Sequence, residues 1–394
     1  MKKNQNTNKL CPILQDRMHS NNDNILPIIV SYKNSKKMPE GKLTALSNMS
    51  NKLNYELPIV NGCACEMCVS AILEIERDPD VEYISYDSRV FAVMDIARKT
   101  IGADNITNTN HTGRGVTVAI IDTGVAPHTD LVYPTNRIVG FKDFVNEKTN
   151  AYDDNGHGTH CAGILGSSGY ASKGKYKGIA PEVNILSVKV LDEKGNGKTS
   201  DILSAIQWII KTKEVYNTKI INLSLGAIAQ YRERRDPLVR AANLAIENNM
   251  IVIAAVGNSG PLRSTILSPA TGRYVISVGA LNDNRTNDLS QNFKIADFSS
   301  RGPTLDRIKK PDLLAPGVDI MSLSNTNLNS YTNLSGTSMS APMVSGVAAL
   351  LLNENSNYSH FDIKRILMNS CSKIKATSVD QGAGVLNLSK IFHK

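Results

Sequence analysis

The chain has 394 residues, of which 41% are hydrophobic and 20% charged, an ordinary globular mixture that excludes a wholly disordered or collagen-like polypeptide. Its net charge of +8 is spread over that length and aromatic residues make up only 5%, which argues against a protein that stacks on nucleic-acid bases. No run approaches the roughly 18 unbroken apolar residues that a membrane helix needs, and no apolar segment follows Lys2 and Lys3 as it would in a secretory signal. We therefore expect a cytoplasmic protein that binds neither nucleic acid nor membrane, with export by another route left open.

Two segments precede the main body of the chain. Residues 1–25 are polar and rich in Asn, and they are predicted to be a disordered tail. Residues 26–94 form a small unit, with strands predicted at 26–32, 56–60, 63–65 and 81–86 and helices at 41–53 and 66–77. Asn61-Gly62 between two of these strands predicts a hairpin with a type I′ turn. The order β-α-β-β-α-β predicts a small ferredoxin-like α+β unit.

The six cysteines are too few and too unevenly spaced for a disulfide scaffold of this size, which favours a reducing compartment. Cys65 and Cys68 form a Cys-x-x-Cys pair beside Cys63, so a metal-binding regulatory protein is one alternative function. However, the predicted elements put Cys65 on a strand and Cys68 at the next helix, and no second pair follows at zinc-ligand spacing. Zinc analysis of the purified protein distinguishes this alternative.

Residues 95–115 are predicted to be a linker and the entry to the next domain, and the pattern then changes to apolar strands that alternate with helices through residue 394. Strands are predicted at 116–121, 185–190, 220–223, 251–255 and 275–278, and helices at 200–216, 237–248, 337–353 and 360–370. Continuous Val and Ile runs separated by helices predict a parallel sheet covered on both faces, which is a three-layer α/β/α domain over 116–394. Reactive groups in such sheets lie beyond the carboxyl ends of the strands.

Three polar blocks follow these strands or open a helix. Asp122 ends a strand before Thr-Gly, His157 lies in Gly-His-Gly-Thr-His, and Ser338 lies in Gly-Thr-Ser-Met-Ser-Ala-Pro at the start of an apolar helix. Each block alone has an ordinary structural explanation, because an Asp after a strand often caps a turn and an isolated His is usually a core or surface residue. The pair His157 and His160 lacks the Glu of a His-Glu-x-x-His zinc protease. Together, in the order Asp, His and Ser, the blocks favour a functional role over a purely structural one.

The three blocks resemble those of the subtilisin-type serine proteases, and the resemblance covers roughly residues 100–390. It implies a catalytic domain in which Ser338 is the nucleophile, His157 the general base and Asp122 the group that orients His157. Asn258, in Gly-Asn-Ser-Gly after a strand, resembles the family's oxyanion-hole residue, with the backbone N–H of Ser338 as the second donor.

Substrate is expected to bind as an extended strand between two segments that resemble the family's substrate edges. The residues carried over are Ser224, Leu225 and Gly226 on one edge, Gly195 and Gly197 on the other, and Ala254, Leu267 and Pro269 in the wall of the primary pocket. The resemblance therefore implies broad specificity, with an apolar or uncharged preference in that pocket. A basic run is predicted to be a solvated face, with selection of acidic substrates as the alternative, and it comprises Arg232, Arg234, Arg235 and Arg240.

The small unit at 26–94 resembles the family's propeptide, which acts as an intramolecular inhibitor and folding template. The chain would then be a zymogen that cleaves itself between Val93 and Thr100, with the tail Val90–Met94 lying along the edge at 222–226. His160 is implied to be structural. Cys161, as in proteinase K-like members, is implied to be a buried small group and not a nucleophile.

No cofactor is required for this chemistry, but calcium sites are common in the family. Asp130 matches a ligand of the family's strong site, whereas the loop at 166–178 contains three lysines and no carboxylate, so we expect that site to be absent. A weaker calcium site built on backbone carbonyls near 270–275, with Asp312, is left open. The main alternative to an enzyme is a catalytically silent pseudoprotease that acts as a regulatory binding partner. The complete Asp, His and Ser set, together with Asn258, favours the enzyme.

Overall fold

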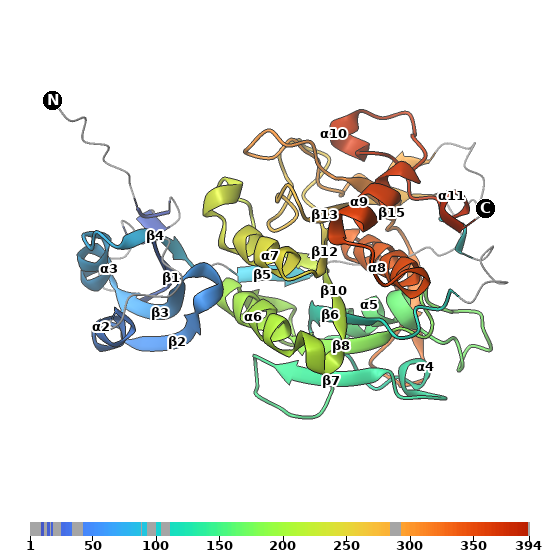
Figure 1. The fold of residues 1–394 in the computed structure, drawn as a ribbon, viewed down its shortest axis with the longest axis horizontal. Helices are drawn as coiled ribbons and strands as arrows, with labels where there is room; N and C mark the ends of the chain where they lie inside the picture. Colours follow the sequence, from blue (N-terminus) through green and yellow to red (C-terminus); the bar gives the residue numbers. More distant parts are fainter. Residues whose placement is uncertain are drawn as a thin grey trace.

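The structure, a computed structural model, describes residues 9–11, 14–15, 17–18, 25–33, 42–87, 89–92, 100–103, 111–283 and 293–392. A small unit in blue lies against a larger domain coloured from green to red (Figure 1). A short strand, β5 (Arg89–Ala92), follows the small unit and lies within the larger domain. Among the described helices, none combines the length and the apolar character needed to cross a bilayer.

The small unit is a four-stranded antiparallel sheet with two helices. Its strands are β1 (Ile25–Tyr32), β2 (Lys52–Leu57), β3 (Gly62–Cys68) and β4 (Val81–Tyr86), and its helices are α2 (Lys42–Met49) and α3 (Val69–Glu76). The strands lie in the order β2-β3-β1-β4. The element order is the β-α-β-β-α-β of a ferredoxin-like unit, as the sequence predicts. The helix predicted at 66–77 begins later, because β3 continues to Cys68.

The hairpin between β2 and β3 does not contain the predicted type I′ turn. A 3₁₀ turn at Pro58–Val60 leads into Asn61, which has a left-handed φ of 53°, and Gly62 does not share this conformation. Gly62 is needed for space instead, since a Cβ at this position would lie 1.8 Å from the carbonyl oxygen of Val30. The glycine therefore allows β1 and β3 to approach.

The predicted disordered tail at 1–25 contains residues of a core. Leu10 and Cys11, in the predicted disordered tail, are buried in the core of the small unit, and the N–H of Cys11 donates to the carbonyl oxygen of Ile84 at 3.0 Å. Ile101 lies in the segment predicted as linker and entry to the catalytic domain, and it is fully buried in the larger domain, where its carbonyl oxygen accepts from the N–H of Leu388 at 2.9 Å. Apolar residues inside polar segments thus join the nearest core.

The larger domain is built on an eight-stranded sheet with the order β14-β13-β12-β10-β6-β8-β7, and β15 pairs with β13. All neighbouring strands are parallel except β13 and β14. The strands are β6 (Thr117–Asp122), β7 (Ile138–Asp143), β8 (Asn184–Lys189), β10 (Thr218–Leu223), β12 (Ile251–Ala255), β13 (Ile276–Asn282), β14 (Lys294–Ile295) and β15 (Leu313–Pro316). The predicted parallel sheet is confirmed. The edge strand β7 escaped prediction because it is mostly half-buried and lacks a continuous apolar run.

Helices cover both faces of this sheet, so the three-layer α/β/α prediction is confirmed (Figure 1). One layer contains α5 (His157–Gly166), α8 (Thr337–Glu354) and α9 (His360–Asn369), and the other contains α6 (Thr199–Tyr216) and α7 (Pro237–Glu247). Successive side chains of β6 point to opposite faces of the sheet. Val118 and Ile120 belong to the first core, under α5, α8 and α9, and Ala119 and Ile121 belong to the second core, under α6 and α7. The shorter elements are η3 (Glu233–Arg235), α4 (Thr129–Val132), α10 (Ser378–Gln381), α11 (Ser389–Phe392), β9 (Asn196–Lys198), β11 (Leu225–Gly226), β16 (Ile320–Leu323) and β17 (Tyr331–Leu334).

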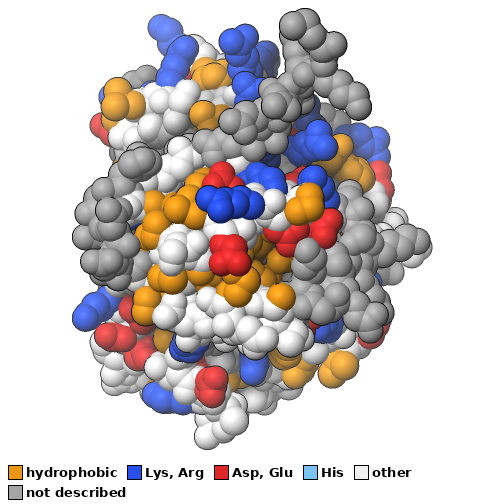
Figure 2. Space-filling view, turned by 90° about the vertical axis from the view of Figure 1, so that its left-hand side faces the viewer, with side chains coloured by type: hydrophobic (Ala, Val, Ile, Leu, Met, Phe, Trp, Pro, Cys, Tyr) orange, Lys and Arg blue, Asp and Glu red, His pale blue; other side chains and the backbone are white. Residues whose placement is uncertain are grey.

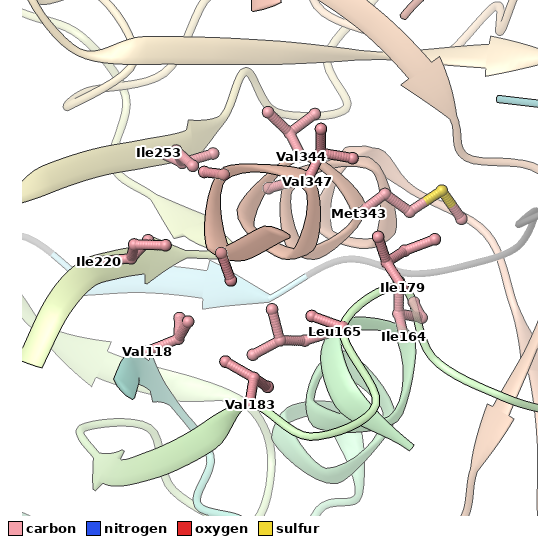
Figure 3. Packing of buried hydrophobic residues seen from close by; sticks show 14 of the residues in the cluster. Val118, Ile164, Leu165, Ile179, Val183, Ile220, Ile253, Met343, Val344 and Val347 are labelled. Carbon is pink, nitrogen blue, oxygen red and sulfur yellow. The ribbon is translucent and has the colours of Figure 1, made fainter. Parts of the chain in front are cut away.

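The first core packs two helices against the sheet. Val344 and Val347 of α8 lie near Ile220 and Ile253 of the sheet, and Leu165 extends from α5 toward the same space (Figure 3). All five side chains are fully buried. Close packing of this kind fixes the first turns of α5 and α8, which carry two of the three polar blocks, relative to the strand ends.

The small unit packs on the second helix layer. Its residues Leu57, Ile59 and Ala64 belong to the same buried cluster as Leu203 of α6 and Leu238 of α7. The two units therefore share one continuous apolar contact.

Part of the basic run, which the sequence predicts to be a solvated face, lies at this contact. The guanidinium of Arg240 lies 3.8 Å from Glu82 of the small unit, and that of Arg235 lies 5.4 Å from the ring centroid of Tyr83. These arginines thus contact the small unit. On the side of the small unit, Lys and Arg side chains are interspersed with acidic and apolar ones (Figure 2).

Candidate active site

Asp122 and His157 meet beyond the carboxyl end of β6. Asp122 is the last residue of β6 and His157 the first residue of α5, and His157 Nδ1 lies 2.6 Å from Asp122 Oδ1. The same carboxylate oxygen accepts from the N–H of Thr123 at 2.8 Å. Both side chains are buried, with 0% exposure for Asp122 and 1% for His157. Because an ionised Asp accepts hydrogen bonds, Nδ1 is the donor and Nε2 can accept a proton.

Glycines and an aspartate shape the start of α5. A Cβ on Gly158 would lie 2.0 Å from the carbonyl oxygen of Gly124, so only glycine allows this helix to approach the turn after β6. Gly156, before the helix, has φ 106°, which favours glycine. Asp153 accepts from the N–H of Gly156 at 2.8 Å and from the N–H and Oγ1 of Thr159 at 2.9 and 2.6 Å. Asp153 therefore stabilises the first turn of α5, a role that sequence reasoning missed.

Ser338, in the first turn of α8, is bonded to the end of β10. Its Oγ donates to the carbonyl oxygen of Ser224 at 2.7 Å, and Ser224 Oγ donates to the carbonyl oxygen of Ser338 at 2.7 Å. Asn222 Nδ2 donates to Ser224 Oγ at 2.9 Å, and Asn222 Oδ1 accepts from Ser345 Oγ at 2.8 Å. This buried network fixes the first turn of α8, with the hydroxyl of Ser338, to the sheet.

Asn258 lies beside the same helix start. The N–H and Oγ1 of Thr337 donate to Asn258 Oδ1 at 3.1 and 2.9 Å, and the N–H of Gly257 donates to Thr337 Oγ1 at 3.1 Å. Because two donors take the amide oxygen, the amide nitrogen is directed elsewhere and can donate. N–H groups in a first helical turn have no acceptor within the helix. The amide of Asn258 and the first turn of α8 thus have the donor chemistry of an oxyanion hole.

Two opposing effects set the pKa of His157. Burial lowers it, and the negative charge of Asp122 and the hydrogen bond to that carboxylate raise it, so that the pKa of His157 lies well above its usual 6.5. The Asp122 carboxylate therefore stabilises the protonated imidazole.

Lys189 is a buried residue of the site that sequence reasoning missed. It lies opposite Asp122 in the pairing of β8 with β6. Its Nζ donates to the carbonyl oxygens of Thr123 and Leu191 at 2.8 and 2.7 Å and to Asp154 Oδ1 at 2.6 Å. Lys189 thus joins the turn after Asp122 to the segment before α5. The sequence signal was a lysine within the apolar run Ser-Val-Lys-Val-Leu.

Cys161 and His160 are buried on α5 next to the reactive groups. Cys161 Sγ lies 3.9 Å from His157 Nδ1, and burial raises the pKa of this thiol, which disfavours the thiolate. His160 Nε2 lies 3.0 Å from the carbonyl oxygen of Ile320, and burial lowers the pKa of His160 to about 3. Asp122, His157 and Cys161 place ligand atoms within 4.8 Å of one another. A metal there would compete with the bond between Asp122 and His157 and would require the disfavoured thiolate.

The two predicted substrate edges enclose a strand of the chain itself. β5 pairs antiparallel with β11, where Ala92 is opposite Leu225 and Phe91 opposite Gly226, and also with β9, where Val90 is opposite Gly197. Ser224 precedes β11, and Gly195 lies in the turn before β9 with φ 76°, outside this three-stranded sheet. The predicted edges therefore lie on either side of β5, and Gly195 belongs to the turn before one of them.

The predicted pocket residues gather near β11. A Cβ on Gly226 would lie 2.9 Å from Leu267 Cβ, and one on Gly257 would lie 2.4 Å from Leu267 Cγ, so the half-buried Leu267 covers both glycines. Pro269 is buried two residues further along. Ala254 is fully buried in the second core and lies behind the wall.

At the position of the family's strong calcium site, which the sequence predicts to be absent, protein donors bind the oxygens. Asp130 Oδ2 accepts from Ser167 Oγ at 2.9 Å and from the hydroxyl of Tyr331 at 2.8 Å, while the buried Arg137 donates to the carbonyl oxygens of Asp130 and Gly166. A guanidinium thus already satisfies oxygens at the first position.

The second position, left open by the sequence, is occupied as well. Lys310 and Lys364 bind Asp312 and the carbonyl oxygen of Val275. Calcium needs six to eight oxygens, so the residues at both positions do not fit the ion.

Residues 113–385 match the sequence profile of the Subtilase family, and the chain belongs to this family. It is 40% identical over 358 residues to serine protease AprX of Bacillus subtilis (strain 168), a match that covers 86% of this chain and 80% of that protein. It is 30% identical over 353 residues to subtilisin E of the same strain, covering 88% and 84%, and 30% identical over 337 residues to the thermostable alkaline protease of Halalkalibacterium halodurans, covering 85% and 83%. The protein is therefore a serine-type endopeptidase that acts on protein or peptide substrates, and its chemistry needs no cofactor.

Proposed function

We propose that this endopeptidase is made as a self-processing zymogen and that residues 26–94 are its inhibitory propeptide. The observation that carries the proposal is the position of β5, which lies between β11 and β9 as an extended substrate would. Ala92 is opposite Leu225, one residue from Ser224, whose carbonyl oxygen accepts from Ser338 Oγ. The expected cut between Val93 and Thr100 follows directly, although residues 93–99 lie outside the described residues.

In the proposed reaction, Ser338 attacks the carbonyl carbon of the scissile peptide. Its hydroxyl turns from the carbonyl oxygen of Ser224 to Nε2 of His157, which takes the proton as the Oγ–C bond forms. Asp122 keeps Nδ1 protonated and stabilises the imidazolium. The negative oxygen of the tetrahedral intermediate accepts from Asn258 Nδ2 and the N–H of Ser338.

The second half of the reaction releases the two products. His157 gives its proton to the leaving amine as the C–N bond breaks, which leaves an acyl-enzyme on Ser338. A water molecule then gives a proton to His157 and attacks the acyl carbon, and return of the proton to Ser338 Oγ restores the enzyme. Peptide backbone pairing with β9 and β11 gives broad specificity, and Leu267 favours an apolar or uncharged side chain in the primary pocket.

The contacts of the small unit support its role as inhibitor. Asp87, after β4, accepts from the N–H of Ser200 at 2.9 Å and from Ser200 Oγ, in the first turn of α6. The N–H of Ile59 donates to Gln207 Oε1 of α6 at 3.2 Å. These contacts and the shared apolar cluster would keep the propeptide bound after the chain is cut.

Intact-mass analysis tests the proposal. Wild type should give two fragments divided between Val93 and Thr100, and Ser338→Ala should remain one chain of 394 residues. Ser335→Ala, an exposed serine three residues away, is the matched control and should process as wild type does. Active wild type that stays whole, or cutting of Ser338→Ala in the same window in a protease-free preparation, would contradict self-processing.

A further inference from the structure

Two lysines converge on the loop that follows the wall of the primary pocket. Lys310 Nζ lies 2.6 Å from Asp312 Oδ2 and donates to the carbonyl oxygen of Val275 at 2.8 Å. Lys364 Nζ lies 3.1 Å from Asp312 Oδ1 and donates to the carbonyl oxygens of Val275 at 3.0 Å and Arg273 at 2.9 Å. Backbone carbonyls and both oxygens of one carboxylate therefore surround a pair of ammonium groups.

This cluster lies inside the domain. The side chains of Lys310, Lys364 and Asp312 are 1%, 15% and 8% exposed. Asp312 Oδ2 also accepts from the N–H and Oγ of Ser277 at 2.8 and 2.9 Å, which fixes the carboxylate to β13. Burial lowers the pKa of Lys310 to about 8 although Asp312 opposes this shift, so Lys310 remains charged at neutral pH. The two ammonium groups lie among the oxygens that a calcium ion would need, so this position does not fit calcium.

The converging carbonyls explain why a positive group is needed. The carbonyl oxygens of Arg273, Tyr274 and Val275 lie 2.9, 3.4 and 3.0 Å from Lys364 Nζ, and a buried carbonyl such as that of Val275 is costly without a donor. The ammonium groups of Lys310 and Lys364 supply the donors. Lys364 thereby connects the loop at 270–275 to α9, and Lys310 connects it to the segment before β15.

We propose that Lys310 and Lys364, held by Asp312, form a built-in cation that fixes the loop at 270–275 and with it the primary pocket, without a metal ion. The loop directly follows Leu267 and Pro269, which were assigned to the pocket wall. Arg137 supports the same principle at the position of the family's strong calcium site, since its guanidinium donates to the carbonyl oxygens of Gly166 and Val183 at 2.5 and 3.2 Å.

Thermal unfolding of the full chain in the Ser338→Ala background tests this proposal without self-digestion. The Tm without further substitution should be the same in millimolar calcium and in excess chelator. Lys310→Met should lower the Tm by at least about 2 °C in both conditions, because it removes the ammonium from buried carbonyls. Lys364→Met, at the edge of the cluster, should cause a smaller loss and provides a second measurement if Lys310→Met does not fold.

A matched pair of double variants tests whether the ammonium pair stands in for a cation. Lys310→Glu with Lys364→Met adds a second carboxylate to the carbonyl oxygens, and calcium should raise its Tm by at least about 2 °C relative to chelator. Lys310→Gln with Lys364→Met has the same shape without the charge and should show no calcium response.

Three results would overturn the proposal. The first is a Tm for both Lys310→Met and Lys364→Met equal to that of the background protein, because the ammonium groups would then not hold the loop. The second is an equal calcium response in the background protein and in the Glu variant. The third is an equal response of the Glu and Gln variants, because the position would then not select a cation.

Discussion

The two units of the molecule use their sheets differently. In the larger domain, both faces of the sheet are covered by helices of the same domain, as the alternation of Ile120 and Ile121 between the two cores illustrates. In the small unit, Val30 faces the unit's own core, whereas Ile29 and Ala64 belong to the cluster formed with α6 and α7. The larger domain therefore completes its own core, and the small unit depends on the larger domain to cover one face.

This difference separates the effects of substitutions in the two units. Substitutions at the strand ends of the larger domain should change the chemistry on every substrate, including the chain itself. Substitutions on the covered face of the small unit should change how long it stays bound after the cut, and leave the chemistry on an added peptide unchanged.

The largest effect is expected from Asn258→Ala. Loss of the amide donor should lower kcat by about 10²–10³, the loss measured for one oxyanion-hole donor in subtilisin, with little change in KM. Self-processing should slow by a similar factor, because the same donor serves both substrates. Steady-state kinetics on a small peptide and the rate of fragment formation measure the two factors, and a loss confined to one substrate would break the proposed division.

A substitution in the covered face of the small unit should weaken the association of the two fragments and leave catalysis unchanged. Ile59 is 8% exposed at the contact with the larger domain, and Ile59→Asp would bury an unpaired carboxylate there. The processed fragments should separate at a concentration about 10²-fold higher than in wild type, with unchanged kcat for an added peptide. Leu73→Asp, at a position that is 41% exposed, is the control. The recovery of peptidase activity after dilution measures how readily the fragments separate in each variant. Equal recovery for Ile59→Asp and Leu73→Asp would show that the contact at Ile59 does not hold the fragments together.

The local patterns predicted the sheet, the three polar blocks and the ferredoxin-like order, because strand alternation and turn residues act within a few positions. The structural role of Lys189 was missed because its partners Thr123 and Asp154 are 66 and 35 residues away in sequence. A local sequence pattern cannot identify partners at such separations. The sequence predicted that Gly62 is needed for the backbone conformation of a tight turn. In the structure a glycine is needed because a Cβ would collide with Val30 of a different strand. Contacts between distant segments thus account for what the sequence could not predict.

The pH dependence of the larger domain should follow His157. Only neutral His157 can accept the proton of Ser338, and the negative charge of Asp122 raises the pKa of His157 above 6.5 despite burial. Activity should therefore be half-maximal on the acid side above pH 6.5 and fall about tenfold for each further pH unit. Profiles of kcat/KM for a peptide without ionisable groups check this, and a profile that stays flat below pH 6.5 would contradict the role of His157.

The smallest effect is expected where the small unit contacts α6 through Asp87. Burial raises the pKa of this carboxyl above 3.8, so the bound propeptide takes up a proton more readily than the free one. Association at this contact should therefore strengthen as pH falls through the raised pKa toward 3.8, and weaken as pH rises. Asp87→Asn keeps a neutral acceptor for the N–H of Ser200, so at pH 7 its fragments should stay together within about twofold of wild type.

Asp87→Ala distinguishes the acceptor from its charge. It leaves the N–H and Oγ of Ser200 without their acceptor, and the fragments should separate about tenfold more readily. The activity recovered on dilution is divided by the activity of fully separated enzyme at the same pH. This ratio removes the pH dependence of catalysis that is due to His157. The Asn variant should lose the pH dependence that wild type shows. If Asn and Ala weaken association equally, the charge of Asp87 matters more than its acceptor geometry, and the raised pKa inferred for this carboxyl is refuted.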